Sequence, residues 1–318
     1  MALILAADIG GTNSRFACFT ADPGGALALR GVARLKTGQA DSFAGLLAAL
    51  WQGEFAPGPQ EFDLAVLAVA GPVQGGSYSR PPNIAWDIRA ADAEKAGLAR
   101  CLLVNDFVAQ AFGCRTDAVR EARVVQAGRA DPAAALAVIG AGTGLGHCAL
   151  VPHGAGFAPV PSEAGHAAFP LYGEAEERFA RFLRERTGKP YPYGDLVVSG
   201  PGLSLLHEFL TGERLPAREI DRRLTPESET LVWFARLYGR ACRNYALSVL
   251  ALGGLFVSGG VAAKNPGLVD NPHFLAEFCD SASHGALLRE IPVRLNLNED
   301  LGLYGAALCG RLSLEGRR

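Results

Sequence analysis

Glycine-rich and acidic stretches supply the residue types that phosphate and sugar chemistry need. The first stretch is Asp8-Ile-Gly-Gly-Thr-Asn13, which follows a short apolar run. Gly10 and Gly11 let the backbone bend sharply and bring its N–H groups close to an anion. Thr12 and Asn13 add side-chain hydrogen bonds, and Asp8 can hold Mg²⁺ through water. An ordinary hairpin turn explains the same residues, so both interpretations stay open at this point.

A second glycine-rich stretch, Gly140-Ala-Gly-Thr-Gly-Leu-Gly146, lies between two apolar runs. A bare hairpin needs only two turn residues. Four glycines in seven residues therefore indicate a backbone kept clear for a ligand, with Gly142, Thr143 and Gly144 at its centre. One such turn in each half of the chain predicts two phosphate clamps. Neither a P-loop nor an opening dinucleotide-binding glycine pattern occurs.

Acidic and polar residues stand at two further places. Asn105-Asp106 ends a buried apolar run, where ligands of α/β folds bind. Asp106 is a candidate general base for a substrate hydroxyl, and a helix N-cap is the alternative. Glu163 and His166, separated by two small residues, can grip adjacent sugar hydroxyls, although an ordinary surface loop has the same composition. No third ligand at metal spacing accompanies this pair, which argues against zinc.

Tandem glycines at Gly259-Gly260 directly follow the buried run 255–258. Glycines at this position permit close packing of a flat ring such as adenine. A tight turn from a strand into a helix is the alternative.

Strands and helices alternate along the chain, which predicts an α/β fold. Short apolar runs predict buried strands, and apolar residues at helical spacing predict helices. The expected strands cover residues 3–8, 14–19, 32–36, 64–69, 101–104, 136–139, 146–151 and 255–258. The expected helices cover residues 43–51, 107–112, 174–186, 202–210, 227–252 and 301–312. A second unit is expected to begin near Arg115 and to repeat the opening strand, turn and strand.

The composition indicates a folded, soluble protein. The 318 residues, 49% of them apolar, suffice for about two domains and a large core. With 30 basic and 32 acidic residues the formal net charge is −2, whereas nucleic-acid binders are usually basic. The seven widely spaced cysteines contain no C-x-x-C and fit a reducing cytoplasm. The longest apolar stretch, 246–258, is shorter than the ~20 residues of a membrane helix.

The order and spacing of these stretches resemble the bacterial glucokinase family, which has the actin-like ATPase (ribonuclease-H-like) fold. The resemblance extends from Leu3 to about Leu308 and includes Ser199-Gly-Pro-Gly202. It implies two domains around a deep cleft. The small α/β domain would comprise residues 1–113 and a C-terminal helix at 301–318, and the large α/β domain residues 114–300. A cytoplasmic homodimer is implied as well, with no membrane or nucleic-acid partner.

The resemblance further implies transfer of the γ-phosphoryl group of ATP to O6 of glucose, the entry step of glycolysis, with Mg²⁺ as cofactor. Asp106 matches the family's catalytic base. The implied sugar ligands are Asn83, Asn105, Asp106, Glu163, His166 and Asp195. The implied ATP-binding residues are Asp8, Gly10, Gly11, Thr12, Asn13, Gly142, Thr143, Gly144, Gly259 and Gly260. Asp8 is expected near the metal, through water, and Asn83 and Trp86 match a loop behind the sugar.

The chain departs from the family pattern at the sugar site. It has Ser162-Glu-Ala-Gly-His166 where the family often has Gly-Glu-Gly-Gly-His, and Asp195 stands where a glutamate is usual. The shorter side chain of Asp195 bears on anomer preference and glucose affinity. Two other functions stay open. One is a kinase for another hexose or an N-acetylhexosamine. The other is a non-catalytic actin-like nucleotide-dependent regulator, which would not need Asp106, Glu163 and His166 together.

Overall fold

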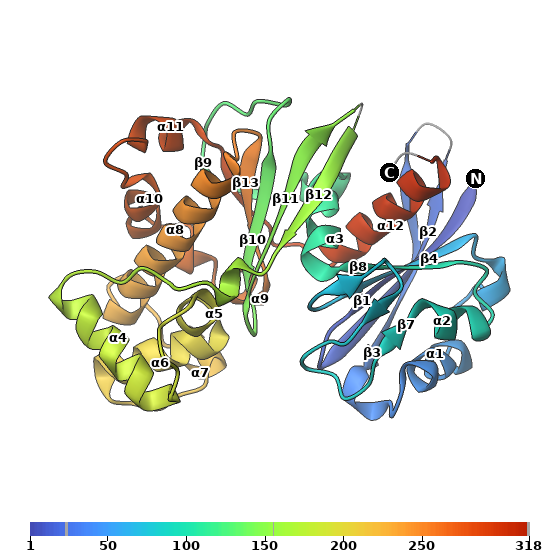
Figure 1. The fold of residues 1–318 in the computed structure, drawn as a ribbon, viewed down its shortest axis with the longest axis horizontal. Helices are drawn as coiled ribbons and strands as arrows, with labels where there is room; N and C mark the ends of the chain where they lie inside the picture. Colours follow the sequence, from blue (N-terminus) through green and yellow to red (C-terminus); the bar gives the residue numbers. More distant parts are fainter. Residues whose placement is uncertain (23–24, 155, 317–318) are drawn as a thin grey trace. The chain divides into compact units, whose positions relative to one another are not determined.

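The computed structural model describes residues 1–22, 25–154 and 156–316 (Figure 1). Contacts within the chain divide it into two units, Met1–Arg120 with Asp300–Arg318, and Glu121–Glu299. Residues 317–318 of the expected C-terminal segment lie outside the described residues. Each unit has its own sheet and its own hydrophobic core.

The first unit is built on a five-stranded sheet with the strand order β3-β2-β1-β4-β8. The strands are β1 (Ala2–Ile9), β2 (Asn13–Ala21), β3 (Leu27–Lys36), β4 (Leu64–Val69) and β8 (Cys101–Asn105). β1, β4 and β8 are parallel, and in register Ile9 pairs with Val69 and Val69 with Asn105. The carboxyl ends of these strands therefore meet at one edge, where ligands of open α/β sheets bind.

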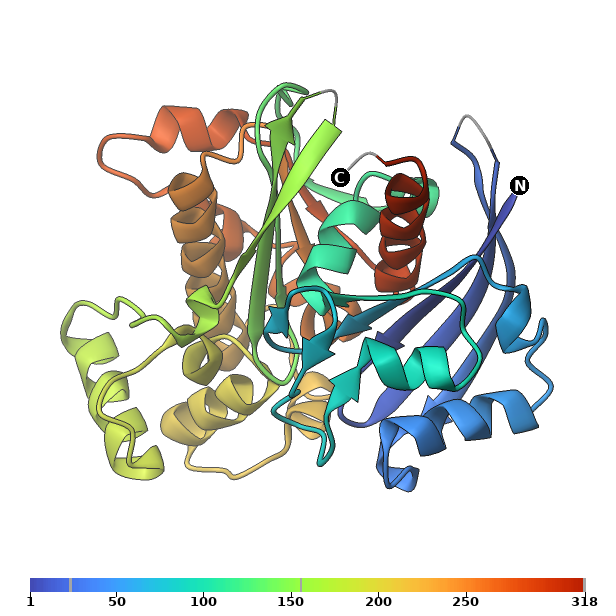
Figure 2. The ribbon, with the colours of Figure 1, turned by 45° about the vertical axis from the view of Figure 1, so that its right-hand side comes forward.

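Helices cover both faces of this sheet. Successive side chains of a strand point to opposite faces. Leu5, Ala7 and Ile9 join the core with α1 (Phe43–Gln52) and α2 (Ala90–Lys95). The opposite face packs against α3 (Asp106–Gly113) and α12 (Leu301–Leu314), which lie side by side in Figures 1 and 2. The two helices approach so closely that a Cβ at Gly305 would lie 1.6 Å from the carbonyl oxygen of Ala109.

The second unit is built on a six-stranded sheet with the order β12-β11-β10-β13-β14-β9. Its strands are β9 (Arg123–Gln126), β10 (Leu136–Ala141), β11 (Leu145–His153), β12 (Gly156–Ser162), β13 (Gly254–Ser258) and β14 (Val293–Leu295). β10, β11 and β12 form an antiparallel meander, and β13 and β14 continue the sheet parallel to β10. The sheet repeats the strand, glycine turn and strand of the first unit.

The longest described helix of the second unit is α8 (Glu229–Val249), which runs beside the sheet in Figure 2. It packs against α6 (Gly200–Thr211) and α10 (Pro272–Cys279). The other helices are α4 (Glu174–Thr187), α5 (Gly194–Val197), α7 (Ala217–Asp221), α9 (Gly260–Lys264) and α11 (Gly285–Glu290). Aromatic residues of α8 and α10, among them Tyr238 and Phe274, are fully buried in the core.

The predicted α/β class is confirmed, and every expected strand and helix has a counterpart. The structure also contains elements that were not among the expected ones. They are the small sheet β5 (Val73–Gln74), β6 (Tyr78–Ser79) and β7 (Ile88–Arg89), the strands β9, β12 and β14, and the helices α2, α5, α7, α9, α10 and α11. β12 contains Pro159 and Pro161, which weaken a strand prediction. These prolines are nevertheless tolerated because β12 is an edge strand. A proline lacks the backbone N–H, and an edge strand has no second neighbouring strand that would need that donor.

In the described part of the chain, none of the helices combines the length and the apolar character needed to cross a membrane.

Candidate active site

Asn105 ends β8 and caps α3. Its Oδ1 accepts the backbone N–H groups of Phe107 at 2.9 Å and Val108 at 3.2 Å. Its Nδ2 donates to the carbonyl oxygen of Gly71 at 3.1 Å and to Oδ1 of Asp106 at 3.0 Å. The N-cap interpretation is thus confirmed for Asn105, and the whole hydrogen-bonding capacity of its amide is used. A sugar hydroxyl that binds Asn105 must share or replace one of these bonds.

Asp106 begins α3, and its carboxylate has a defined orientation. Oδ1 accepts from Nδ2 of Asn105 and from the backbone N–H of Phe107, both at 3.0 Å. The side chain is partly buried at the sheet edge where β1, β4 and β8 end. An oriented carboxylate is what a general base requires.

The Gly10–Asn13 turn is supported from below by two buried hydroxyl groups. Gly10 N–H donates to the carbonyl oxygen of Asn13 at 3.1 Å, which closes the turn. Oγ1 of Thr37 donates to the carbonyl oxygen of Gly10 at 2.7 Å, and Oγ of Ser14 lies 2.7 Å from the same hydroxyl. Thr37 is far from the turn in sequence and was not predicted. The sequence does not reveal this contact, because it depends on the pairing of β2 with β3, which brings η1 (Thr37–Gln39) next to the turn.

Asn83 lies beside this turn. A Cβ at Gly11 would be 2.8 Å from both the Cβ and the carbonyl oxygen of Asn83. The same loop is anchored by Trp86, whose Nε1 donates to the carbonyl oxygen of Ala40 at 2.9 Å and whose ring stacks on Phe43. Trp86 therefore holds the loop to the core, while the exposed Asn83 is presented next to the turn.

Asp8 is the carboxylate nearest the end of β1. Burial raises its pKa, the charge of Arg15 lowers it, and the charge of Asp300 raises it. Asp300 is itself paired with Arg34 at 3.1 Å and with Arg15 at 3.8 Å. Across residues 1–22, 25–154 and 156–316, no group of three His, Cys, Asp or Glu residues could hold a metal ion. A single carboxylate fits Mg²⁺ that arrives with a nucleotide and keeps most of its waters.

The second unit brings Glu163, His166 and Asp195 together. Oε2 of Glu163 lies 3.7 Å from Nε2 of His166, and Oδ2 of Asp195 lies 3.6 Å from Nδ1 of the same ring. The side chains of Glu163 and His166 are 55% and 65% exposed. Glu163 follows β12, His166 ends the short helix η4 (Ala164–His166), and Asp195 lies on α5. The arrangement offers carboxylate acceptors and an imidazole to one polar ligand.

Asp195 also contacts the second glycine turn. Its Oδ1 accepts the backbone N–H of Leu145 at 2.8 Å. A Cβ at Gly144 would lie 2.7 Å from its Oδ2, and a Cβ at Gly165 would lie 2.3 Å from its Oδ1. Asp195 therefore lies between the residues expected to bind the sugar and the turn expected to bind phosphate.

The Gly142–Gly144 turn borders a cavity of about 530 Å³ in the second unit. Gly142 N–H donates to the carbonyl oxygen of Gly144, and Gly200 N–H donates to that of Gly142, both at 2.8 Å. Gly142, the exposed Thr143 and Gly260 all line this cavity. Three residues that the sequence predicts to bind the nucleotide therefore line the same cavity, although they lie far apart in the chain.

Gly259 plays a different part from Gly260. Its φ is +89°, and a Cβ would lie 2.5 Å from the carbonyl oxygen of Ala141. Close packing against β10 therefore requires glycine at position 259. This agrees with the alternative interpretation, in which the glycine serves a tight turn from a strand into a helix. A Cβ at Gly260, in contrast, meets nothing within 4 Å.

Several residues that line the cavity were not predicted: Pro201, Ser204, Pro216, Ala217, Arg218, Asp221, Val261 and Lys264. Burial raises the pKa of Asp221, and the charge of Lys264 lowers it. Oδ1 of Asp221 is buried and has no hydrogen-bond partner among the described residues. No motif marks Asp221 or Lys264, since each lies at the end of a five-residue helix with an ordinary polar composition.

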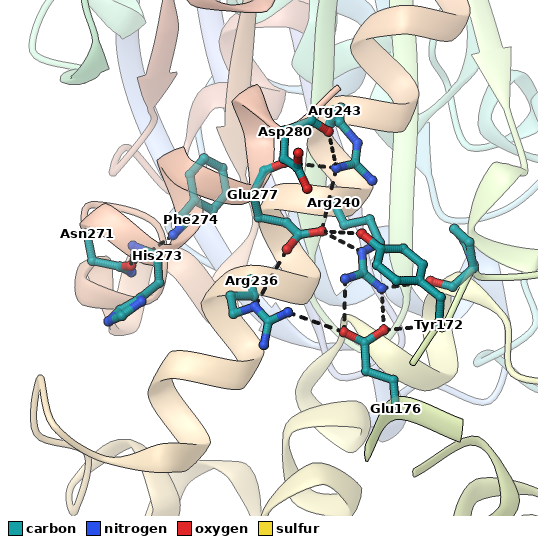
Figure 3. A network of polar contacts seen from close by, with 11 residues as sticks. Tyr172, Glu176, Arg236, Arg240, Arg243, Asn271, His273, Phe274, Glu277 and Asp280 are labelled. Atoms are coloured by element: carbon teal, nitrogen blue, oxygen red, sulfur yellow. Dashed lines mark hydrogen bonds and ion pairs between the residues drawn. The ribbon is translucent and has the colours of Figure 1, made fainter. Parts of the chain in front are cut away.

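A buried ionic network supports the segment that follows His166 (Figure 3). Arg240 of α8 is fully buried and donates to Glu176 at 2.6 and 2.9 Å, to Glu277 at 2.7 Å, and to the carbonyl oxygen of Pro170 at 2.9 Å. Its guanidinium lies 4.0 Å from the centre of the Tyr172 ring. Burial raises the pKa of Glu277, but hydrogen bonds and charge from Arg240 outweigh burial and hold that pKa below its usual value. The network fixes residues 170–176 to α8 and α10.

Comparison with known proteins agrees with these features. Residues 5–313 match the family model described as Glucokinase. The chain is 33% identical to the glucokinase of Rhizobium meliloti (strain 1021) over 335 residues, covering 99% of this chain and 96% of that protein. It resembles the crystal structure of a glucokinase from an Antarctic psychrotroph with a TM-score of 0.82 at 28% identity, covering 97% of this chain and 98% of that one.

A more distant likeness concerns the fold alone. A ROK family glucokinase from Streptomyces griseus, solved in complex with glucose and AMPPNP, has a TM-score of 0.58 at 18% identity and covers 98% of this chain and 99% of that one. The likeness supports the actin-like ATPase fold for both units. With a family model that matches nearly the whole chain and a relative of 33% identity along it, this chain belongs to the glucokinase family.

Proposed function

We propose that this chain transfers the γ-phosphoryl group of ATP to the 6-hydroxyl of glucose. The proposal rests mainly on His166, which lies between the carboxylates of Glu163 and Asp195. Asp195 also accepts the backbone N–H of Leu145, directly after the glycine turn. A sugar site and a phosphate-binding turn in direct contact are what a sugar kinase needs. Membership of the glucokinase family supports the same choice of substrates.

Glucose recognition rests on polar side chains that accept or donate hydrogen bonds at adjacent hydroxyls. Glu163 and Asp195 supply carboxylate oxygens, and His166 supplies a ring nitrogen between them. Hydrogen bonds to charged groups are stronger than neutral ones, which suits a substrate made almost entirely of hydroxyls. Asn83 and Asn105 contribute amide groups.

Asp106 acts as the general base. It accepts the proton of the 6-hydroxyl as the sugar oxygen bonds to the γ-phosphorus and the bond to the leaving oxygen of ADP breaks. Phosphoryl transfer demands alignment more than covalent help. The bonds from Asn105 and Phe107 that fix the Asp106 carboxylate therefore contribute directly to the rate.

The phosphate chain is held by the two glycine turns. The N–H groups of Gly10 and Gly142 close the turns, so the other N–H groups of each turn are the ones that bind anionic oxygens, with Thr12 and Thr143 as hydroxyl donors. Asp8 holds the nucleotide's Mg²⁺ through water, and that ion offsets negative charge on the phosphates. Exposed side chains at Thr12, Asn13 and Thr143 suit contact with a ligand.

A coupled assay that follows ADP or glucose 6-phosphate tests the proposal. Glucose, mannose, fructose and N-acetylglucosamine are compared as acceptors, and ATP, ADP and polyphosphate as donors. We expect the highest kcat/KM for glucose with ATP, and loss of turnover without Mg²⁺. Preference for another hexose would assign the chain to that sugar instead. Absence of sugar-dependent turnover with every donor would leave only a nucleotide-dependent regulator.

The resemblance to the family also leads us to propose a homodimer that works in the cytoplasm. Sedimentation velocity at micromolar concentration tests the dimer, and a single monomeric species would contradict it.

A further inference from the structure

The 530 Å³ cavity of the second unit contains an acidic group that the phosphate and sugar sites do not use. Asp221, at the end of α7, lines this cavity together with Lys264 of α9 and Thr143 of the glycine turn. Two cationic side chains, Arg218 and Lys264, line the same space. An acid next to two cations and a glycine turn suits a ligand that has both hydroxyl groups and phosphates.

One carboxylate oxygen of Asp221 is unsatisfied in the described part of the chain. Its Oδ1 is buried and accepts no hydrogen bond from any described residue. Lys264 acts on Asp221 through its charge. Buried polar atoms are nearly always hydrogen-bonded, so the unsatisfied Oδ1 of a residue that lines the cavity indicates a missing donor. A bound ligand can supply that donor.

We propose that Asp221 accepts hydrogen bonds from the ribose hydroxyls of the nucleotide, with Lys264 and Arg218 directing positive charge at its phosphates. The proposal rests on the proposed function, because it names a contact of the same nucleotide. In a nucleotide the ribose lies between the base and the phosphates. Asp221 lines a cavity bordered both by Thr143, expected at the phosphates, and by Gly260, expected at the adenosine.

Ribose fits a carboxylate better than adenine does. The two neighbouring hydroxyls of ribose present two donors, which match two acceptor oxygens. The Hoogsteen edge of adenine presents one amino donor beside the N7 acceptor, so the second carboxylate oxygen would face a lone pair; asparagine or glutamine suits that edge. Acidic residues bind ribose hydroxyls in the same way in dinucleotide-binding folds.

Equilibrium binding measured by calorimetry tests the contact without any sugar present. ADP, 2′-deoxy-ADP, 3′-deoxy-ADP and IDP, which lacks the amino group of the base, are titrated into the unaltered protein, Asp221→Ala and Asp221→Asn. Glu219→Gln, on the same helix but outside the cavity lining, is the matched control. We expect the unaltered protein and Glu219→Gln to bind at least one deoxy nucleotide about 10- to 150-fold more weakly than ADP, the range for a hydrogen bond to a charged group.

In Asp221→Ala the same deoxy nucleotide and ADP should bind within about threefold of each other, because the discriminating acceptor is gone. Equal binding of ADP and both deoxy forms by the unaltered protein overturns the proposal. So does discrimination that persists in Asp221→Ala, a loss confined to IDP, or failure to bind any of the four nucleotides. Should Asp221→Ala fail to fold, Asp221→Asn and the unaltered protein still decide the question.

Glucose phosphorylation is assayed on the same preparations. Ribose discrimination without sugar phosphorylation would uphold the contact and reject the proposed function. Sugar phosphorylation without ribose discrimination would uphold the proposed function and reject the contact between Asp221 and the ribose.

Discussion

The carboxylate of Asp195 accepts the backbone N–H of Leu145 at 2.8 Å. Leu145 directly follows the glycine turn, and the other oxygen of Asp195 faces His166 at 3.6 Å. Within the second unit, one side chain thus connects the residues proposed to bind the sugar with the turn proposed to bind phosphate. Gly144 and Gly165 approach Asp195 so closely that their absent Cβ atoms would lie 2.7 and 2.3 Å from it. The short arm of aspartate matches this restricted space.

Replacing Asp195 by asparagine or by alanine should separate its two contacts. Asparagine can keep an oxygen on the Leu145 N–H but offers an amide to His166 and the sugar, so we expect a raised glucose KM with little change for ATP. Alanine removes both contacts and should raise both KM values, glucose by about 10- to 150-fold. Steady-state kinetics with each substrate varied in turn measures the split. Unchanged KM values in the alanine variant would remove Asp195 from the sugar site.

Asp106→Asn should lower kcat by about 10²–10⁴-fold and leave glucose affinity within an order of magnitude. The amide oxygen can keep both bonds that Oδ1 now accepts, from Asn105 and Phe107, so α3 should stay intact. What the amide cannot do is accept the proton of the 6-hydroxyl. Coupled turnover and tryptophan-fluorescence titration with glucose measure the two quantities. Near-normal turnover would limit Asp106 to a role in the helix terminus.

Gly142→Val should raise the ATP KM and lower kcat with the fold intact. A Cβ at Gly142 meets nothing within 4 Å, so the branched side chain enters open space at the cavity rather than protein. Gly11→Val is a poorer test, since its Cβ would lie 2.8 Å from the backbone oxygen of Asn83 and would disturb the loop. Kinetics and thermal melting are compared for both variants. A Gly142→Val protein with normal ATP kinetics would contradict the phosphate clamp.

Arg240→Met should destabilise the protein by about 3–5 kcal/mol, because it removes the shortest ion pair of both buried carboxylates, Glu176 and Glu277. Arg178→Ala is the surface control. Its pair with Glu174 is 57% and 90% exposed and should be worth no more than about 0.5 kcal/mol. Urea unfolding followed by circular dichroism gives both values. A loss below about 1 kcal/mol for Arg240→Met would show that the network contributes little to stability.

Because His147 is buried, we expect the free energy of unfolding to decrease in mild acid. The residue is buried on β11 against Tyr245, and burial lowers its pKa to about 4. The unfolded chain binds a proton near pH 6.5 and the folded chain only near pH 4, so protonation favours unfolding. Stability is therefore complete above pH 6.5 and falls as the pH drops toward 4, by about 3 kcal/mol in all.

The test compares urea unfolding at pH 7.5 and pH 5 for the unaltered protein and His147→Leu. The leucine variant should lose about 2 kcal/mol less between these two values, since it has no proton to take up on unfolding. Equal pH dependence of the two proteins would mean that His147 titrates normally in the folded state.

Local patterns predicted much of the framework. Apolar runs and glycine turns located β1, β2, β10 and β11, because a buried strand followed by a tight turn has a clear composition. Shorter elements escaped prediction. The two-residue strands β5, β6 and β7 have no periodicity to detect, and β12 has prolines that only its place at the sheet edge makes acceptable.

Residue types and spacing were sufficient to select the chemistry: Asp106 after a buried strand, Glu163 beside His166, and two glycine turns. Tertiary structure alone decided which side chains meet. It placed Asp195 next to Leu145, Thr37 next to Gly10, and Asp221, whose Oδ1 has no hydrogen-bond partner among the described residues, in the lining of the cavity that Thr143 and Gly260 also line. The physical reason is the range over which each interaction acts. Turn and strand preferences act between near neighbours in the chain, whereas these contacts join residues 27 to 117 positions apart, which only the folded sheets and helices bring within reach.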